Sequence, residues 1–135
     1  MKNNIKNKKI LFYEKILENN MKKAKLYDNV FEAEKIIYVN DFDSAISHLE
    51  KDKTDILLIE TGNINETISN QVFDMRNRFP NIIIVVLSIT HNLNLKRDFL
   101  EIIDLYIKRP TTPFFVLNEL TQYLEVYESK SEVSS

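Results

Sequence analysis

Short apolar runs, separated by longer stretches of mixed polarity, repeat along the whole chain. They lie at residues 9–13, 36–39, 54–60, 81–88 and 105–107. Runs of this length that are rich in β-branched and aromatic residues predict strands. The third and fourth runs are almost continuously apolar, which is typical of strands buried on both faces of a parallel sheet.

Between the runs, apolar residues recur every three or four positions, the spacing of one helix face. The clearest case is the set Phe42, Ala45, Ile46 and Leu49, with Asn40 or Asp41 placed to cap the helix. The other predicted helices carry the stripes Leu17, Met21, Ala24, Tyr27 and Phe31; Ile68, Val72, Met75 and Phe79, ended by Pro80; Leu95, Phe99 and Ile102; and Leu117, Leu120, Leu124 and Tyr127, after Thr112 and Pro113.

Strands and helices therefore alternate from one end of the chain to the other. This order predicts right-handed βαβ units and one parallel five-stranded sheet covered on both faces, a three-layer α/β/α sandwich. We expect residues 8–127 to form this domain. Residues 1–7 are expected to form a flexible N-terminal arm, and residues 128–135 a polar tail or the start of a linker.

Composition narrows the functional classes. The chain has 135 residues, 44% hydrophobic and 28% charged, with a formal net charge of -2, which gives no strong attraction to nucleic acid or membrane. It has no cysteine, no apolar run long enough to span a bilayer and no signal peptide, so a cytoplasmic location is expected. Its two histidines predict no metal site. The run of residues 22–25, Lys-Lys-Ala-Lys, is interpreted as a solvated helix face.

Polar residues follow most of the predicted strands. Glu14 and Lys15 follow the first strand, Glu60 ends the third, Ser88 ends the fourth and Arg109 follows the fifth. In an open α/β sheet the carboxyl ends of the strands border the functional crevice, so Glu60 is expected to point into it. Gly62 is the only glycine, which excludes a glycine-rich phosphate loop.

This arrangement resembles the receiver domain of bacterial two-component response regulators over about residues 8–127. That family has the flavodoxin-like strand order 2-1-3-4-5. It carries an acidic pair after strand one, a phosphoacceptor Asp after strand three, a Ser or Thr after strand four, an aromatic in strand five, and then Lys-Pro. Here those places hold Glu14-Lys15, Glu60, Ser88, Tyr106 and Arg109-Pro110.

The resemblance implies a degenerate phosphorylation site. In the family the acidic pair and the Asp bind Mg²⁺, but Lys15 brings an ammonium group and the side chain of Glu60 is one methylene longer than Asp. We expect Lys15 or Arg109 to hold Glu60, with no metal, no cofactor and no catalytic residue. A glutamate here can, in this family, partly imitate the phosphorylated state, so a structural and a mimicking role for Glu60 both stay open.

The function implied is that of an atypical receiver, a signalling module without conventional Asp phosphorylation. It would bind a protein partner or itself through the face of helix four, strand five and helix five, which draws on Lys96, Arg97, Phe99, Tyr106 (the switch aromatic) and Lys108. Neither nucleic acid nor membrane is an expected partner of the domain itself.

Two alternatives remain at this point. One is a receiver that is phosphorylated with Mg²⁺ on an unconventional residue such as Thr61 or Ser88, as the N-terminal domain of a transcription regulator or signalling enzyme. The other is a flavodoxin-like flavin binder, which would need a Ser/Thr-rich phosphate loop where this chain has Glu14-Lys15-Ile16-Leu17.

Overall fold

A single parallel sheet forms the centre of the protein. The computed structural model describes residues 5–14, 20–89 and 97–133. Its five strands are arranged in the order β2-β1-β3-β4-β5, as the resemblance implied. They are β1 (Lys9–Glu14), β2 (Lys35–Val39), β3 (Ile56–Glu60), β4 (Ile83–Ser88) and β5 (Leu105–Lys108).

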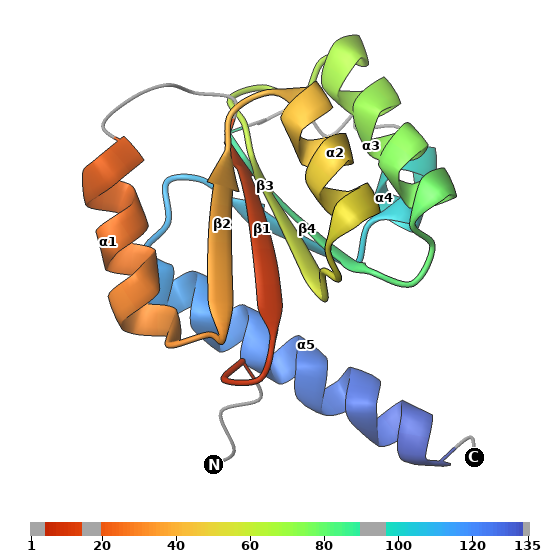
Figure 1. The fold of residues 1–135 in the computed structure, drawn as a ribbon. Helices are drawn as coiled ribbons and strands as arrows, with labels where there is room; N and C mark the ends of the chain where they lie inside the picture. The colour runs from red at the N-terminus through yellow and green to blue at the C-terminus, as the bar shows by residue number, and fades with distance from the viewer. Residues whose placement is uncertain (1–4, 15–19, 90–96, 134–135) are drawn as a thin grey trace.

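Helices cover both faces of the sheet, which confirms the predicted three-layer α/β/α architecture (Figure 1). α1 and α5 lie on one face, and α2, α3 and α4 lie on the other. The helices are α1 (Asn20–Phe31), α2 (Phe42–Lys51), α3 (Glu66–Arg78), α4 (Arg97–Ile102) and α5 (Pro113–Val133). Among these described helices none has the length and apolar character needed to cross a membrane.

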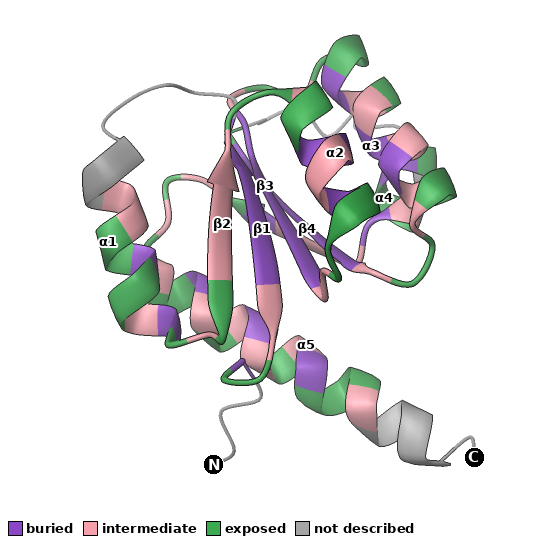
Figure 2. Ribbon diagram, viewed as in Figure 1, coloured by how far each residue is buried: buried purple, intermediate pink, exposed green. Residues whose placement is uncertain are grey.

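The three inner strands are buried almost from end to end, as Figure 2 shows. Alternate residues point to opposite faces, because successive side chains of a strand alternate. Phe12 and Leu58 pack with Tyr27 of α1 on one face, whereas Leu11 and Leu57 belong to the cluster on the α2–α3–α4 face. This two-sided burial explains why the third and fourth apolar runs contain so few polar residues.

Side-chain caps mark the starts of three helices. Asp41, one of the two predicted caps, accepts a 2.7 Å hydrogen bond from the backbone N–H of Ser44. Asn65 accepts one from Ile68 N–H, and Thr112 accepts one from Phe115 N–H, as predicted for the last helix. Such caps satisfy N–H groups that have no partner inside the helix.

Residues 5 and 128–133, which the structure describes near the two ends, differ from the prediction, whereas residues 1–4 and 134–135 lie outside the described ranges. Ile5, assigned to a flexible arm, is fully buried in the core cluster under α1 and α5. α5 continues through residues 128–133, where a tail was expected, since that segment contains no glycine or proline to end the helix. On α5, Val116 is buried, whereas Tyr127, predicted to be buried, is exposed.

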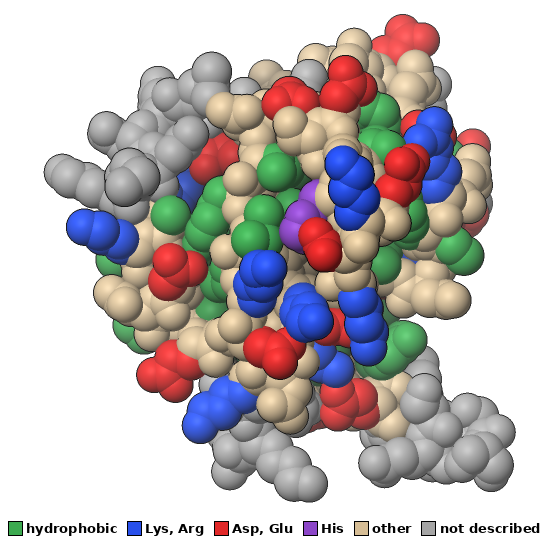
Figure 3. Space-filling view, in the orientation of Figure 1, with side chains coloured by type: hydrophobic (Ala, Val, Ile, Leu, Met, Phe, Trp, Pro, Cys, Tyr) green, Lys and Arg blue, Asp and Glu red, His purple; other side chains and the backbone are tan. Residues whose placement is uncertain are grey.

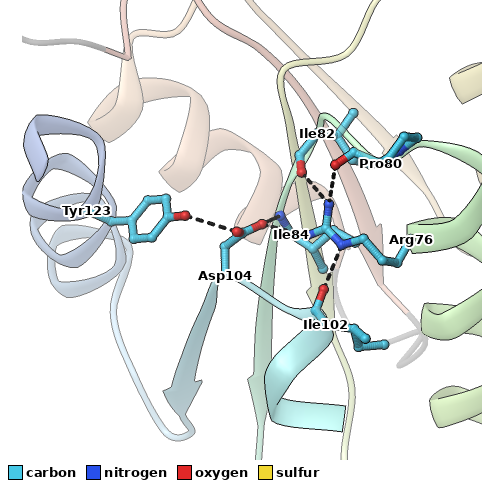
Figure 4. A network of polar contacts seen from close by, with 7 residues as sticks. All are labelled: Arg76, Pro80, Ile82, Ile84, Ile102, Asp104 and Tyr123. Carbon is cyan, nitrogen blue, oxygen red and sulfur yellow. Dashed lines mark hydrogen bonds and ion pairs between the residues drawn. The ribbon is translucent and has the colours of Figure 1, made fainter. Parts of the chain in front are cut away.

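A polar network ties four elements together at the amino end of β4 (Figure 4). The Arg76 guanidinium donates hydrogen bonds to the backbone oxygens of Pro80, Ile82 and Ile102, and to Asp104 Oδ2 at 2.6 Å. Asp104 in turn accepts bonds from the backbone N–H of Ile84 and from the Tyr123 hydroxyl, at 2.8 and 2.9 Å. The network therefore joins α3, β4, the α4–β5 turn and α5.

Candidate functional site

Two carboxylates lie side by side at the carboxyl end of the sheet. Glu14 ends β1 and Glu60 ends β3, and the two residues are paired in register between these neighbouring strands. Only 5% of Glu14 and 4% of Glu60 is exposed. Two buried negative charges this close are unstable unless cations or protons balance them.

Lys23 of α1 supplies the first cation. Its ammonium nitrogen lies 2.9 Å from Glu60 Oε2 and 3.2 Å from Glu14 Oε1, so one group bridges both carboxylates. The interpretation of residues 22–25 as a solvated face is therefore wrong for Lys23. The signal that could have found it is its spacing, because Lys23, Tyr27 and Phe31 follow one another at four-residue intervals on the buried face of α1.

Arg109 supplies the second cation. Its Nε lies 3.1 Å from Glu60 Oε2, and its Nη1 donates a hydrogen bond of 3.1 Å to the backbone oxygen of Thr61. The expected contact between Glu60 and Arg109 is thus present. Lys15, the other cation expected there, lies outside the described residues. Among the described residues, Lys23 and Arg109 therefore supply the cations that contact Glu14 and Glu60.

Burial dominates the electrostatics of Glu14. Its desolvation raises the pKa of the Glu14 carboxyl, and the Lys23 hydrogen bond and charge offset only part of that effect. Burial also raises the pKa of the Tyr27 hydroxyl, with a further contribution from the charge of Glu60. Glu60 Oε1 is buried and accepts no hydrogen bond from the described residues, so both cations act through Oε2.

The oxygen ligands that the crevice offers do not fit a magnesium ion. Mg²⁺ needs oxygen ligands at about 2.0 to 2.1 Å in octahedral geometry, usually one or two carboxylates with several waters. Here the Lys23 ammonium takes the position between Glu14 and Glu60 that a shared ion would need. Across the described ranges, no group of three or more acidic, histidine or cysteine side chains gathers in a way that could hold a metal.

The two hydroxyl residues of the crevice are buried. Thr61 is 4% exposed and Ser88 is fully buried, and the Ser88 hydroxyl donates a 2.7 Å hydrogen bond to the backbone oxygen of Gly62. Backbone bonds from Thr61 to Leu87, from Ile89 to Gly62 and from Arg109 to Ser88 join the loops behind the strands. At the crevice, the segments that follow β3, β4 and β5 are therefore held together by backbone hydrogen bonds.

The predicted interaction face is only partly as expected. Phe99 is 1% exposed, so it is a core residue of the α2–α3–α4 face and not a surface contact. Lys108 is exposed, and Tyr106 is half-buried against the same core cluster. The side chains of Lys96 and Arg97 lie outside the described residues.

Exposed apolar residues that the prediction missed lie on this face. Leu100 of α4 is exposed, as are Phe115 and Val126 of α5. Phe115 and Val126 are eleven residues apart, about three helical turns, and so share one side of α5. Val126 follows Tyr123 by three residues, and Tyr123 reaches Asp104 beside β5, which places that side of α5 next to the β5 edge.

Comparisons with known proteins agree with this fold. No protein-family model matches the sequence, and no curated protein matches it. Among solved structures, a CheY-like response regulator receiver domain protein of Methanospirillum hungatei has a TM-score of 0.75 and 14% identity, covering 92% of this chain and 98% of that chain. The signal receiver domain of a LuxO repressor protein of Vibrio parahaemolyticus has a TM-score of 0.74 and 10% identity, covering 96% and 98%.

A response regulator of Thermotoga maritima is similar as well, with a TM-score of 0.70 and 17% identity over 88% of this chain and 98% of that one. At identities this low, the similarity supports a shared fold but gives no information about the chemistry of the crevice. The chain therefore has the fold of the response regulator receiver domains.

Proposed function

We propose that the protein is an atypical receiver, a signalling and protein-interaction module that works without phosphorylation of an aspartate and is not an enzyme. The observation that carries this proposal is the double contact on Glu60 Oε2, from Lys23 at 2.9 Å and Arg109 at 3.1 Å. Phosphoryl transfer needs a metal or cationic group aimed at the transferred phosphoryl oxygens. In this crevice the two cations that the structure describes, Lys23 and Arg109, are bound to the protein's own carboxylates.

The same contacts support one resting conformation. Lys23 belongs to α1, Glu60 ends β3 and Arg109 follows β5, so the carboxylate of Glu60 joins three separate elements. Moving Lys23 and Arg109 away while Glu60 stays buried would leave a buried charge without a counter-charge, which is costly. We propose that the contacts of Glu60 with Lys23 and Arg109, here called the Glu60 lock, hold the domain in this conformation. Glu60 would then permanently replace the phosphoryl group that comes and goes in a switchable receiver.

Incubation with acetyl phosphate and Mg²⁺, followed by intact-mass measurement, tests the proposal. A conventional receiver domain serves as the positive control for the phosphodonor. We expect no phosphoryl adduct on this protein. An adduct would overturn the proposal, and mapping it to Thr61 or Ser88 would establish the alternative of an unconventional acceptor, although both hydroxyl residues are buried.

We propose further that a protein partner, or a second copy of the chain, binds the α4–β5–α5 face. Support comes from the exposed apolar side chains Leu100, Phe115 and Val126 beside the charged Lys108, since apolar anchors with a charged rim are typical of interfaces. Sedimentation of Phe115→Ser tests self-association. Phe114→Ser is the matched control, because Phe114 is even more exposed, at 72%, and lies one residue away on another side of the helix.

A further inference from the structure

A second candidate site lies at the other end of the sheet from Glu60. A cavity of about 60 Å³ opens where the strands begin, between β1, β2 and the end of α2. Its polar lining consists of Lys9, Lys35, His48, Asp52, Lys53 and Thr54. Lys9 and Glu14 are the first and last residues of β1, so at about 3.3 Å per residue roughly 16 Å separates this cavity from the crevice.

The lining is rich in unbalanced positive charge. Lys9, Lys35 and Lys53 form no ion pair with any described residue, whereas Lys8, Lys23, Arg76, Arg78 and Arg109 all do. The one carboxylate of the lining, Asp52, is mostly exposed and lies 3.5 Å from His48 Nδ1. Asp55, nearby, accepts a hydrogen bond from the backbone N–H of Lys9.

Figure 3 shows this surface in the orientation of Figure 1, with lysine and arginine side chains gathered below the one visible histidine. Lys51 adds a fourth ammonium group, because it lines the adjoining hollow together with His48 and Asp52. The two hollows and Asp55 together bring four lysines and three aspartates, Asp43, Asp52 and Asp55, to this surface. The local formal charge is therefore positive, although the whole chain has a net charge of -2.

We propose that this cavity binds a phosphate-sized oxyanion. A bound water needs about 10 to 15 Å³ of such space, so a cavity of about 60 Å³ takes about four to six heavy atoms. A tetrahedral oxyanion such as phosphate fits this size, whereas a sugar or a base does not. Lysine ammonium groups are strongly hydrated point charges that bind phosphate without demanding a planar geometry. The ligand is free phosphate or the terminal phosphate of a larger molecule whose remainder lies outside the cavity.

This proposal is independent of the Glu60 lock, because the two sites share no residue. Titrating ¹⁵N-labelled protein with inorganic phosphate at constant ionic strength tests it. We expect saturable shifts at the backbone amides of Lys9, Lys35, His48 and Lys53. A parallel titration with O-phosphoserine distinguishes the two sources, since equal affinity indicates recognition of a terminal phosphate and markedly weaker binding indicates a site for the free ion.

Charge variants decide whether the site is specific. Lys35→Gln with Lys53→Gln should weaken phosphate binding about tenfold, a loss of about 1.4 kcal/mol. The control, Lys25→Gln with Lys108→Gln, removes the same charge from two exposed lysines elsewhere and should change the affinity less than about twofold. Asp52→Asn should tighten binding, because it removes the carboxylate from the lining. Absence of saturable shifts at these amides, or equal weakening in both double variants, would overturn the proposal.

Discussion

Lys23 and Glu60 are 37 residues apart in the sequence, yet the ammonium group of Lys23 donates a 2.9 Å hydrogen bond to the Glu60 carboxylate. The contact depends on α1, whose buried residues Tyr27 and Phe31 fix the rotation of the helix and turn Lys23 toward the end of β3. Because 27% of the Lys23 side chain is exposed, the pair is partly screened by solvent. Of the cations in the described ranges, Lys23 nevertheless lies nearest to both buried carboxylates.

Removing this ammonium group should destabilise the protein. In Lys23→Met the aliphatic part of the side chain is retained. Among the described residues, however, Glu14 then has no ion-pair partner and Glu60 keeps only Arg109. We expect the free energy of unfolding to fall by about 2 kcal/mol. Urea unfolding measures it, with Lys25→Met, an exposed lysine of the same helix, as the control that should stay within about 0.5 kcal/mol.

Replacing Arg109 by lysine should lower the stability of the protein. Its guanidinium contacts Glu60 through Nε and the Thr61 carbonyl through Nη1, and a single ammonium group cannot reproduce this pair of directions. We expect Arg109→Lys to lower the free energy of unfolding by about 1 kcal/mol. Unchanged stability would show that the guanidinium geometry does not matter there.

Glu14 should make stability depend on pH. Burial raises the pKa of its carboxyl above the ordinary 4.5. At a pH between these two pKa values, the folded protein therefore holds a proton that the unfolded chain has already released. Stability contributed by this group is therefore lost as pH rises from about 4.5 through the raised folded pKa. The Glu14→Gln variant has no carboxyl group at this position, so it does not undergo this loss of stability as the pH rises. Its stability relative to the natural protein should increase across that window, and a constant difference in urea unfolding at several pH values would contradict the assignment.

The network around Arg76 gives a sharper stability test. Arg76→Lys leaves backbone oxygens of the α3–β4 and α4–β5 turns without donors, and should cost about 3 kcal/mol. Arg78→Lys is the matched control. Arg78 forms surface ion pairs with Glu50 and Asp74, so this substitution should change stability by less than about 1 kcal/mol. Equal effects of the two substitutions would show that the network is not a structural brace.

Much of the fold was predictable because its physical signals are local. Runs such as residues 83–88, buried on both faces, can only be central strands, and the stripe of Phe42, Ala45, Ile46 and Leu49 gives the rotation of α2. The caps Asp41 and Thr112 were predictable for the same reason, because a cap acts on residues two or three positions away.

The parts that sequence reasoning missed depend on distant contacts. Lys23 looks like one lysine in a basic run, and only the packing of α1 against the sheet turns it toward Glu60. Phe99 was placed on the interaction face from the family resemblance, although its position in the apolar stripe with Leu95 and Ile102 is the local signal that agrees with its burial. Burial of Ile5 likewise depends on α1 and α5, which follow it by many residues.

The most direct test of the central claim is to titrate the natural protein with Mg²⁺ while recording NMR spectra. The signals to observe are those of the Glu14 and Glu60 carboxyl carbons and of the Lys23 side chain. We predict no saturable change in the natural protein. We also predict at least a tenfold gain in Mg²⁺ affinity for Lys23→Gln, in which the two carboxylates lose the cation between them. Saturable binding to the natural protein, with the Lys23 signals moving to those of a solvated ammonium group, would contradict the account.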